Sequence, residues 1–119
     1  MKLIIAGGRS YIPQFRHLNM IATLLNTLRP TEIVSGAAPG ADAFGEAIAK
    51  ALRLPCTQFK ANWEAHGKGA GPMRNADMAQ YADACILLPG GRGTESIRLM
   101  AKRENIPIYD LRNKEYKHD

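Results

Sequence analysis

The sequence predicts an α/β domain of the Rossmann-like, three-layer kind, with a parallel sheet of about five strands and helices on both faces. Short apolar runs alternate with helical patterns along the whole chain. Glycines cluster where a predicted strand passes into a helix and are missing where a helix passes into the next strand. A length of 119 residues leaves room for a single compact domain.

The predicted strands are short and rich in isoleucine, valine, leucine or aromatic residues. They are Lys2–Ala6, Glu32–Ser35, Cys56–Phe59, Ala84–Leu88 and Ile106–Tyr109. Apolar residues spaced three and four apart predict helices over Gln14–Leu28, Ala41–Leu52, Met73–Tyr81 and Thr94–Glu104. Because each helix joins one strand to the next, we expect right-handed crossovers and parallel strands. The polar stretch Lys60–Gly71 fits neither pattern, and we expect a long functional or mobile loop there.

The composition is that of a folded protein. Sixteen Lys and Arg against eleven Asp and Glu give a net charge of +5, and 45% of the residues are hydrophobic, which excludes a disordered chain. The positive balance suits an anionic ligand. Residues 1–112 are expected to form the domain, and residues 113–119 a frayed C-terminal tail.

Cysteine and histidine usage indicates neither a disulfide framework nor a metal site. Cys56 and Cys85 each lie in a short apolar run, so we expect both to be buried and reduced, with a bridge between them as the alternative. His17, His66 and His118 lack the spacing of metal ligands, and no cofactor is predicted. No apolar run has the length of a signal peptide or a membrane span, so we expect a cytoplasmic protein without a membrane partner.

Glycine-rich turns follow the first, second and fourth predicted strands. All of them should lie at the carboxyl edge of the sheet, where open α/β sheets bind ligands. The turn after the fourth strand holds Gly90, Gly91, Arg92, Gly93 and Thr94. Its amide groups and the N-terminus of the next helix suit a phosphate, and Thr94 could either cap that helix or donate its hydroxyl. A turn that merely connects strand to helix is the alternative.

The other two turns have the same construction. Candidate ligand-binding residues are Ser35, Gly36, Gly40 and Asp42 after the second strand, and Gly7, Gly8, Arg9 and Ser10 after the first. Asp42 could cap the following helix or bond a ribose hydroxyl. The Arg9 guanidinium is suited to a phosphate, unless it is a surface arginine without a role.

Arg74 and Trp63 are further candidates near the polar stretch. Arg74 is predicted in the first turn of the third helix, where its charge opposes the helix dipole and a bound anion would remove the conflict. Asn75 is a candidate partner for it. Trp63 could stack on a base or pack the loop against the domain.

Taken together, these motifs resemble the SLOG superfamily of Rossmann-like domains, and most closely its small branch related to YspA and YpsA. The likeness covers residues 2 to about 110, and its matching stretches lie at residues 4–10, 33–42, 63–75, 81–84 and 89–94. It implies a parallel sheet with a nucleotide or nucleotide-derived ligand at its carboxyl edge.

The sequence is more distantly similar to the Lonely Guy phosphoribohydrolases, which cleave the base from a nucleoside 5′-monophosphate. Those enzymes place an arginine fifteen residues before a P-G-G-x-G-T-x-x-E motif, and Arg74 stands fifteen residues before Pro89. The similarity implies that Arg74 is catalytic and that the turn at 90–94 binds phosphate. Ile97 occupies the position of the motif's glutamate, which leaves Glu95 as the nearby candidate for the catalytic acid.

A third similarity, in S-G-x-x-x-G-A-D at residues 35–42, is to DprA, which binds single-stranded DNA. Aromatic residues make up only 7% of this chain, and no stripe of alternating basic and aromatic residues is present. We therefore rank binding of a phosphorylated nucleotide-type small molecule first, N-glycosidic hydrolysis second and nucleic-acid binding third. Because the sheet has exposed edges, pairing of two copies into a homo-oligomer is kept as an alternative.

Overall fold

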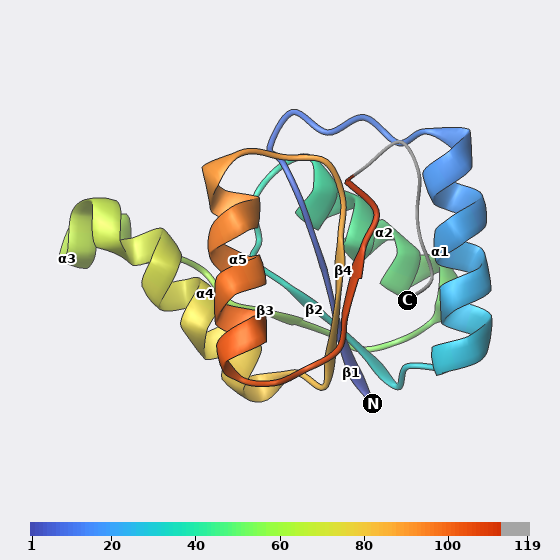
Figure 1. Ribbon diagram of the computed structural model, residues 1–119. Helices are drawn as coiled ribbons and strands as arrows, with labels where there is room; N and C mark the ends of the chain where they lie inside the picture. Colours follow the sequence, from blue (N-terminus) through green and yellow to red (C-terminus); the bar gives the residue numbers. More distant parts are fainter. Residues whose placement is uncertain (113–119) are drawn as a thin grey trace.

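The computed structural model describes residues 1–112 and contains a five-stranded, fully parallel sheet in the order β3-β2-β1-β4-β5 (Figure 1). The strands are β1 (Lys2–Ala6), β2 (Glu32–Ser35), β3 (Cys56–Gln58), β4 (Ala84–Leu87) and β5 (Ile108–Asp110). The helices are α1 (Phe15–Leu28), α2 (Ala41–Leu52), α3 (Trp63–His66), α4 (Ala70–Tyr81) and α5 (Arg92–Arg103), with a 3-10 turn η1 (Gly67–Gly69). The predicted Rossmann-like fold is confirmed, and the predicted tail at 113–119 lies outside the described residues.

The central strand β1 serves two hydrophobic cores. Successive side chains of a strand point to opposite faces of the sheet. Leu3 and Ile5 accordingly pack in one cluster with side chains of α1 and α2, whereas Ile4 packs in another with Met78 of α4 and Ile97 of α5. Figure 1 shows these two helix pairs on opposite sides of the sheet. The alternation gives the three layers and leaves the carboxyl ends of the strands uncovered.

The order of the strands reverses at β1. The chain moves outward through β2 and β3 and then crosses back to place β4 on the other side of β1. Ile5 pairs with Ile86 and Ala6 with Leu87, so the two strands end at the same level. Because the connections after β1 and β4 then run to opposite faces of the sheet, a crevice forms between them at the carboxyl edge.

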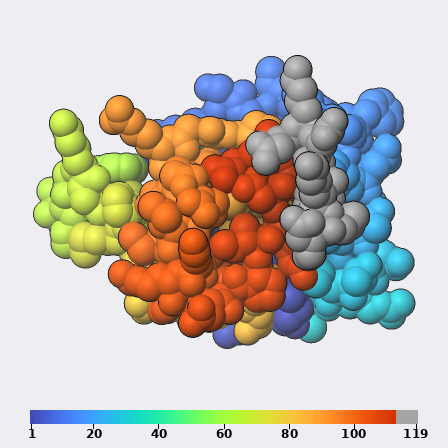
Figure 2. Space-filling view, viewed as in Figure 1, coloured from blue at the N-terminus to red at the C-terminus, as the bar shows by residue number. Residues whose placement is uncertain are grey.

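The segment Lys60–Gly71 is not the long loop that the sequence predicts. It contains α3, η1 and the start of α4, which begins at Ala70 and not at Met73. The Asn62 side chain caps α3 by accepting the Ala65 N–H at 3.1 Å. The sequence analysis did not predict these helices, because the segment is rich in glycine and glycine is a weak helix former. In Figure 2 the yellow-green part of this segment projects from the body of the protein.

Cys56 also differs from the prediction, because it is exposed. Cys56 lies on β3, which is the strand at the edge of the sheet. The residues of β3 are exposed or only partly buried. Cys85 on the inner strand β4 is buried as predicted, and burial raises the pKa of its thiol above the ordinary value. Both thiols are free. No helix within residues 1–112 is long and apolar enough to cross a membrane.

Gly40 joins the turn after β2 to the turn after β1. Its φ is +76°, and a Cβ there would lie 2.3 Å from the carbonyl oxygen of Gly8 and 2.5 Å from that of Arg9. The Gly8 carbonyl oxygen also accepts the N–H of Ala41 at 3.0 Å. The start of α2 is therefore held directly against the backbone that forms the crevice.

We expect Gly40→Ala to lower the free energy of unfolding by about 2 kcal/mol or more, because it combines a left-handed backbone with a clash against carbonyl oxygens. Gly69→Ala is the matched control, since Gly69 has a φ of −76° and no neighbour within 4 Å of a Cβ. Urea denaturation of both variants measures the difference. Equal loss of stability in the two would contradict the close contact at Gly40.

Candidate functional site

A cavity of about 280 Å³ opens at the carboxyl edge of the sheet, between the turns that follow β1, β2 and β4. Glycines from all three turns line it, namely Gly7, Gly8, Gly36, Gly91 and Gly93. Its polar and charged lining side chains are Arg9, Asp42, Arg74, Asn75, Arg92 and Thr94. The structure thus brings together most of the residues that the sequence singled out.

Four of the predicted binding residues do not line this cavity. Ser10 and Gly90 line a neighbouring, more open hollow beside the turn after β1. Ser35 is buried beneath the site, where its hydroxyl donates to Glu46 Oε2 at 2.6 Å and accepts the Ala37 N–H at 3.0 Å. Gly40 supports the turns from behind. These residues shape the cavity without forming its surface.

The first turn of α5 contributes the donors on one side of the cavity. The residue before the helix is Gly91, and no side chain caps it. The first amide groups of a helix have no partner within the helix and carry the positive end of its dipole. Thr94 lines the cavity and is 3% exposed, yet its hydroxyl has no hydrogen-bond partner among the described residues. The capping role that the sequence allowed for Thr94 is therefore wrong.

Arg74 is held firmly on the opposite side. Its Nη1 donates to the carbonyl oxygen of Gly36, and its Nε donates to Asn75 Oδ1 at 2.9 Å. Asn75 Nδ2 donates in turn to Ser96 Oγ of α5 at 3.2 Å. The side chain therefore links the turn after β2 to α5. Since α4 begins at Ala70, Arg74 lies in its second turn, and the predicted conflict with the helix dipole does not exist.

Asp42 is the carboxyl group of the cavity. It is 6% exposed, and its Oδ2 accepts the N–H of Ala38 at 3.2 Å. No side chain caps α2, so the predicted capping role of Asp42 is also wrong. Burial raises its pKa from the usual 3.8 to about 6, although the bond from Ala38 and the charge of Arg74 act in the opposite direction. A carboxyl group with this pKa can accept or release a proton near neutral pH.

Asp42 and Arg74 stand close together across Gly36. Asp42 Oδ2 and Arg74 Nη1 each lie 2.8 Å from the point that a Cβ of Gly36 would occupy. The two atoms are therefore within twice that distance of each other. The absence of a side chain at Gly36 is what allows a carboxyl group and a guanidinium to share one wall of the cavity.

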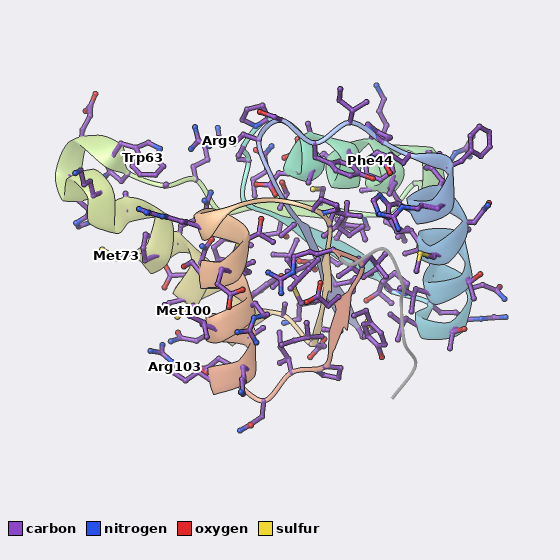
Figure 3. The ribbon with its side chains drawn as sticks, turned by 45° about the horizontal axis from the view of Figure 1, so that its top comes forward. Arg9, Phe44, Trp63, Met73, Met100 and Arg103 are labelled. Carbon is purple, nitrogen blue, oxygen red and sulfur yellow. The ribbon has the colours of Figure 1, made fainter. Side chains whose placement is uncertain are left out.

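Arg9 and Trp63 lie side by side at the mouth of the site (Figure 3). The Arg9 guanidinium carbon is 5.7 Å from the centre of the Trp63 ring, within range of a cation–π interaction. Trp63 also packs against α4, because its ring atom Cη2 is 3.3 Å from the position of a Gly71 Cβ. The packing role predicted for Trp63 is therefore present, and 49% of the residue stays exposed.

Glu95 does not line the cavity. Its carboxylate pairs with Arg98 and, at 2.9 Å, with Arg112, and these guanidinium groups lower its pKa to about 2. Ile97 lies one helical turn after Thr94 and lines the cavity together with it. The acid that the Lonely Guy motif has at this position is thus replaced by an apolar surface.

The sequence analysis missed the apolar floor formed by Met78 and Ile97 and the position of Asn75 within the cavity wall. Asn75 and Met78 follow Arg74 by one and four residues on α4. The predicted helix Met73–Tyr81 already contains Arg74 and Met78 four residues apart, so this spacing could have indicated that both face the cavity. Among residues 1–112, no three side chains of His, Cys, Asp or Glu are grouped so that they could hold a metal ion.

The fold and this crevice define a small Rossmann-like α/β domain with a polar site at the carboxyl edge of its sheet. The chain belongs to the YspA, cpYpsA-related SLOG family, whose sequence profile matches residues 1–66. It is also similar to the Gene 61 protein of Mycobacterium phage D29, with 34% identity over 90 residues, which covers 69% of this chain and 72% of the phage protein. Membership of the family suggests a nucleotide-related ligand. The matched residues include the turns after β1 and β2, Asp42 and Trp63.

The raised pKa of Asp42 predicts an unusual dependence of stability on pH. The folded protein holds this proton more tightly than the unfolded chain, so the free energy of unfolding should fall as the pH rises from 3.8 to about 6 and then level off. Asp42→Asn should lose that dependence and be more stable at neutral pH by about 3 kcal/mol. Urea denaturation across this pH range measures both effects.

Asp77→Asn is the matched control for this experiment, because Asp77 is exposed on the same helix as Arg74. It should keep the pH dependence of the wild-type protein. Identical pH profiles for Asp42→Asn and the wild-type protein would contradict the buried, desolvated state of the Asp42 carboxyl group.

Proposed function

We propose that this domain binds a phosphorylated, nucleotide-type small molecule in the cavity at the carboxyl edge of its sheet. The observation that carries the proposal is the Thr94 hydroxyl, which is buried in the cavity wall, lacks a partner among residues 1–112 and stands at the N-terminus of α5. Leaving a buried hydroxyl without a partner costs free energy. A phosphate oxygen would satisfy it together with the first amide groups of the helix.

The remaining groups fit the same ligand. Arg74 supplies a fixed positive charge opposite α5, and Arg9 and Arg92 supply further positive charge at the rim. The volume of about 280 Å³ is at the small end for ligand sites, which suits a sugar phosphate rather than a polymer. Asp42 lies where a carboxyl group could accept a hydrogen bond from a ribose hydroxyl. A net charge of +5 favours the approach of an anion.

Thr94→Val should separate the effect of the unpartnered hydroxyl on stability from its effect on ligand affinity. We expect the variant to be more stable than the wild-type protein by about 1 kcal/mol, because a methyl group replaces a hydroxyl that has no partner. It should bind nucleoside monophosphates about tenfold more weakly, because one hydrogen bond to a charged group is lost. Denaturation measures the first effect and titration calorimetry the second.

Thr94→Ser keeps the hydroxyl and serves as the control, so it should retain the affinity of the wild-type protein to within a few-fold. The calorimetric panel comprises nucleoside monophosphates, ribose 5-phosphate and ADP-ribose. Binding of none of these to the wild-type protein would overturn the proposed function. Equal affinities of Thr94→Val and Thr94→Ser would contradict a hydrogen bond between the Thr94 hydroxyl and the phosphate.

Asp42 favours a second function, hydrolysis of the N-glycosidic bond of a nucleoside 5′-monophosphate. In this reaction a water molecule attacks C1′ of the ribose, the bond from C1′ to the base nitrogen breaks, and ribose 5-phosphate and the free base are formed. Asp42 would accept the proton of the attacking water and stabilise the positive charge that develops on the sugar. That proton ends on the nitrogen of the departing base, which leaves as the neutral free base and returns Asp42 to its carboxylate form. Its place beside Arg74 makes it a better candidate for this acid than Glu95, whose carboxylate is paired outside the cavity.

Chromatographic detection of free base during incubation with the four common ribonucleoside monophosphates tests this second function. We expect Asp42→Asn to lower the rate of base release at least about 100-fold, the usual effect of losing a general base. Arg74→Ala should lower the rate as well, because the positive charge that faces the phosphate is lost. Glu95→Gln should retain the rate of the wild-type protein. Full activity of Asp42→Asn, or no base released from any substrate, would rule out this chemistry.

A further inference from the structure

A second cavity, of about 290 Å³, adjoins the first one, which is proposed to bind phosphate, on the side of α3. It lies between the turn after β2 and the segment that leads into α3, and Lys60 and Trp63 form its outer wall. Arg9, Gly36 and Arg74 line both cavities. The two hollows are therefore neighbours with shared walls, and one extended molecule could occupy both.

Trp63 has a position that core packing does not explain. It belongs to neither hydrophobic core cluster of the described residues, and about half of it is exposed. Its backbone is fixed by the Asn62 cap of α3, and the edge of its ring rests on Gly71 of α4. A large aromatic ring is thus held at the side of a polar cavity with much of its surface open to solvent.

Arg9 reaches the same place from the turn after β1. Its guanidinium carbon is 5.7 Å from the centre of the Trp63 ring, and the residue is exposed, so it can shift to admit a flat group (Figure 3). Both side chains stack on nucleic-acid bases, Trp63 through its π-face and Arg9 through its planar guanidinium. Both side chains line the second cavity, so it offers two flat surfaces beside the first one.

We propose that this second cavity is a base subsite, in which the heterocyclic base of the ligand stacks on Trp63 with Arg9 beside it. The inference rests on the proposed function, because the phosphate of the same molecule would lie at the N-terminus of α5. It narrows the ligand class to nucleotides that retain an aromatic base. A sugar phosphate without a base would occupy only the first cavity.

The single tryptophan of the chain provides a direct signal. Selective excitation of tryptophan reports on Trp63 alone, so its fluorescence should be quenched saturably by adenosine monophosphate and remain nearly unchanged with ribose 5-phosphate. Calorimetry should show that ribose 5-phosphate binds more weakly than adenosine monophosphate by about tenfold, since stacking of one base on an aromatic side chain contributes about 1–3 kcal/mol.

Variants of Trp63 separate stacking from the shape of the site. Trp63→Leu should bind adenosine monophosphate about tenfold more weakly than the wild-type protein and ribose 5-phosphate equally well, whereas Trp63→Phe should keep most of the preference for the base. Phe15→Leu is the matched control, because Phe15 is an exposed aromatic residue on α1, 83% exposed and outside both cavities. It should change neither affinity.

The outcomes distinguish this inference from the proposed function. Equal affinities for the two ligands, unaffected by Trp63→Leu, would overturn the base subsite and leave the phosphate site standing. Equal losses for both ligands in Trp63→Leu would show that Trp63 supports the site without stacking, which also overturns the inference. Failure of both ligands to bind the wild-type protein would overturn the proposed function together with the base subsite.

Discussion

The close approach of two backbone turns at the carboxyl ends of β1 and β4 is the constraint on which the site depends. The Gly8 N–H donates to the Pro89 carbonyl oxygen at 2.9 Å, and a Cβ on Gly90 would lie 2.5 Å from Gly8 N and 2.1 Å from Thr94 Oγ1. Only a residue without a side chain fits between these groups. The contact places the first turn of α5 beside the crevice, so the dipole of that helix and the Thr94 hydroxyl face the same space.

Near this contact, a buried carboxyl group lies beside a positively charged side chain. Burial favours the neutral form of Asp42, while the neighbouring Arg74 favours the charged form. Arg74 is held beside Asp42 by hydrogen bonds that Gly36 and Asn75 accept. The site thus combines positive charge with a group that titrates near physiological pH. The same geometry therefore supports both the proposed binding function and the second, hydrolytic one.

The sequence predicted the layered fold and the three glycine turns, because apolar periodicity and glycine position are local signals. It did not predict that α3 and the first turn of α4 lie within Lys60–Gly71, because glycines at 67, 69 and 71 suggest a loop. The exposure of Cys56 depends on the order of strands in the sheet, which no local pattern encodes. Asp42 was among the residues predicted for the site, and it lines the cavity. The position of Glu95 outside the cavity depends on its partners Arg98 and Arg112, which only the packed structure defines. Nucleic-acid binding and homo-oligomer formation stay predictions.

Amide chemical shifts test the central claim most directly, because they report where a ligand contacts the backbone. Titration of isotopically labelled protein with adenosine monophosphate should shift the amide resonances of Gly8, Gly36 and residues 91–94 more than all others. Those residues come from three separate turns and meet only at the cavity. Shifts that are absent at saturating ligand, or that gather on α1 or β5 instead, would contradict a nucleotide site at the carboxyl edge of the sheet.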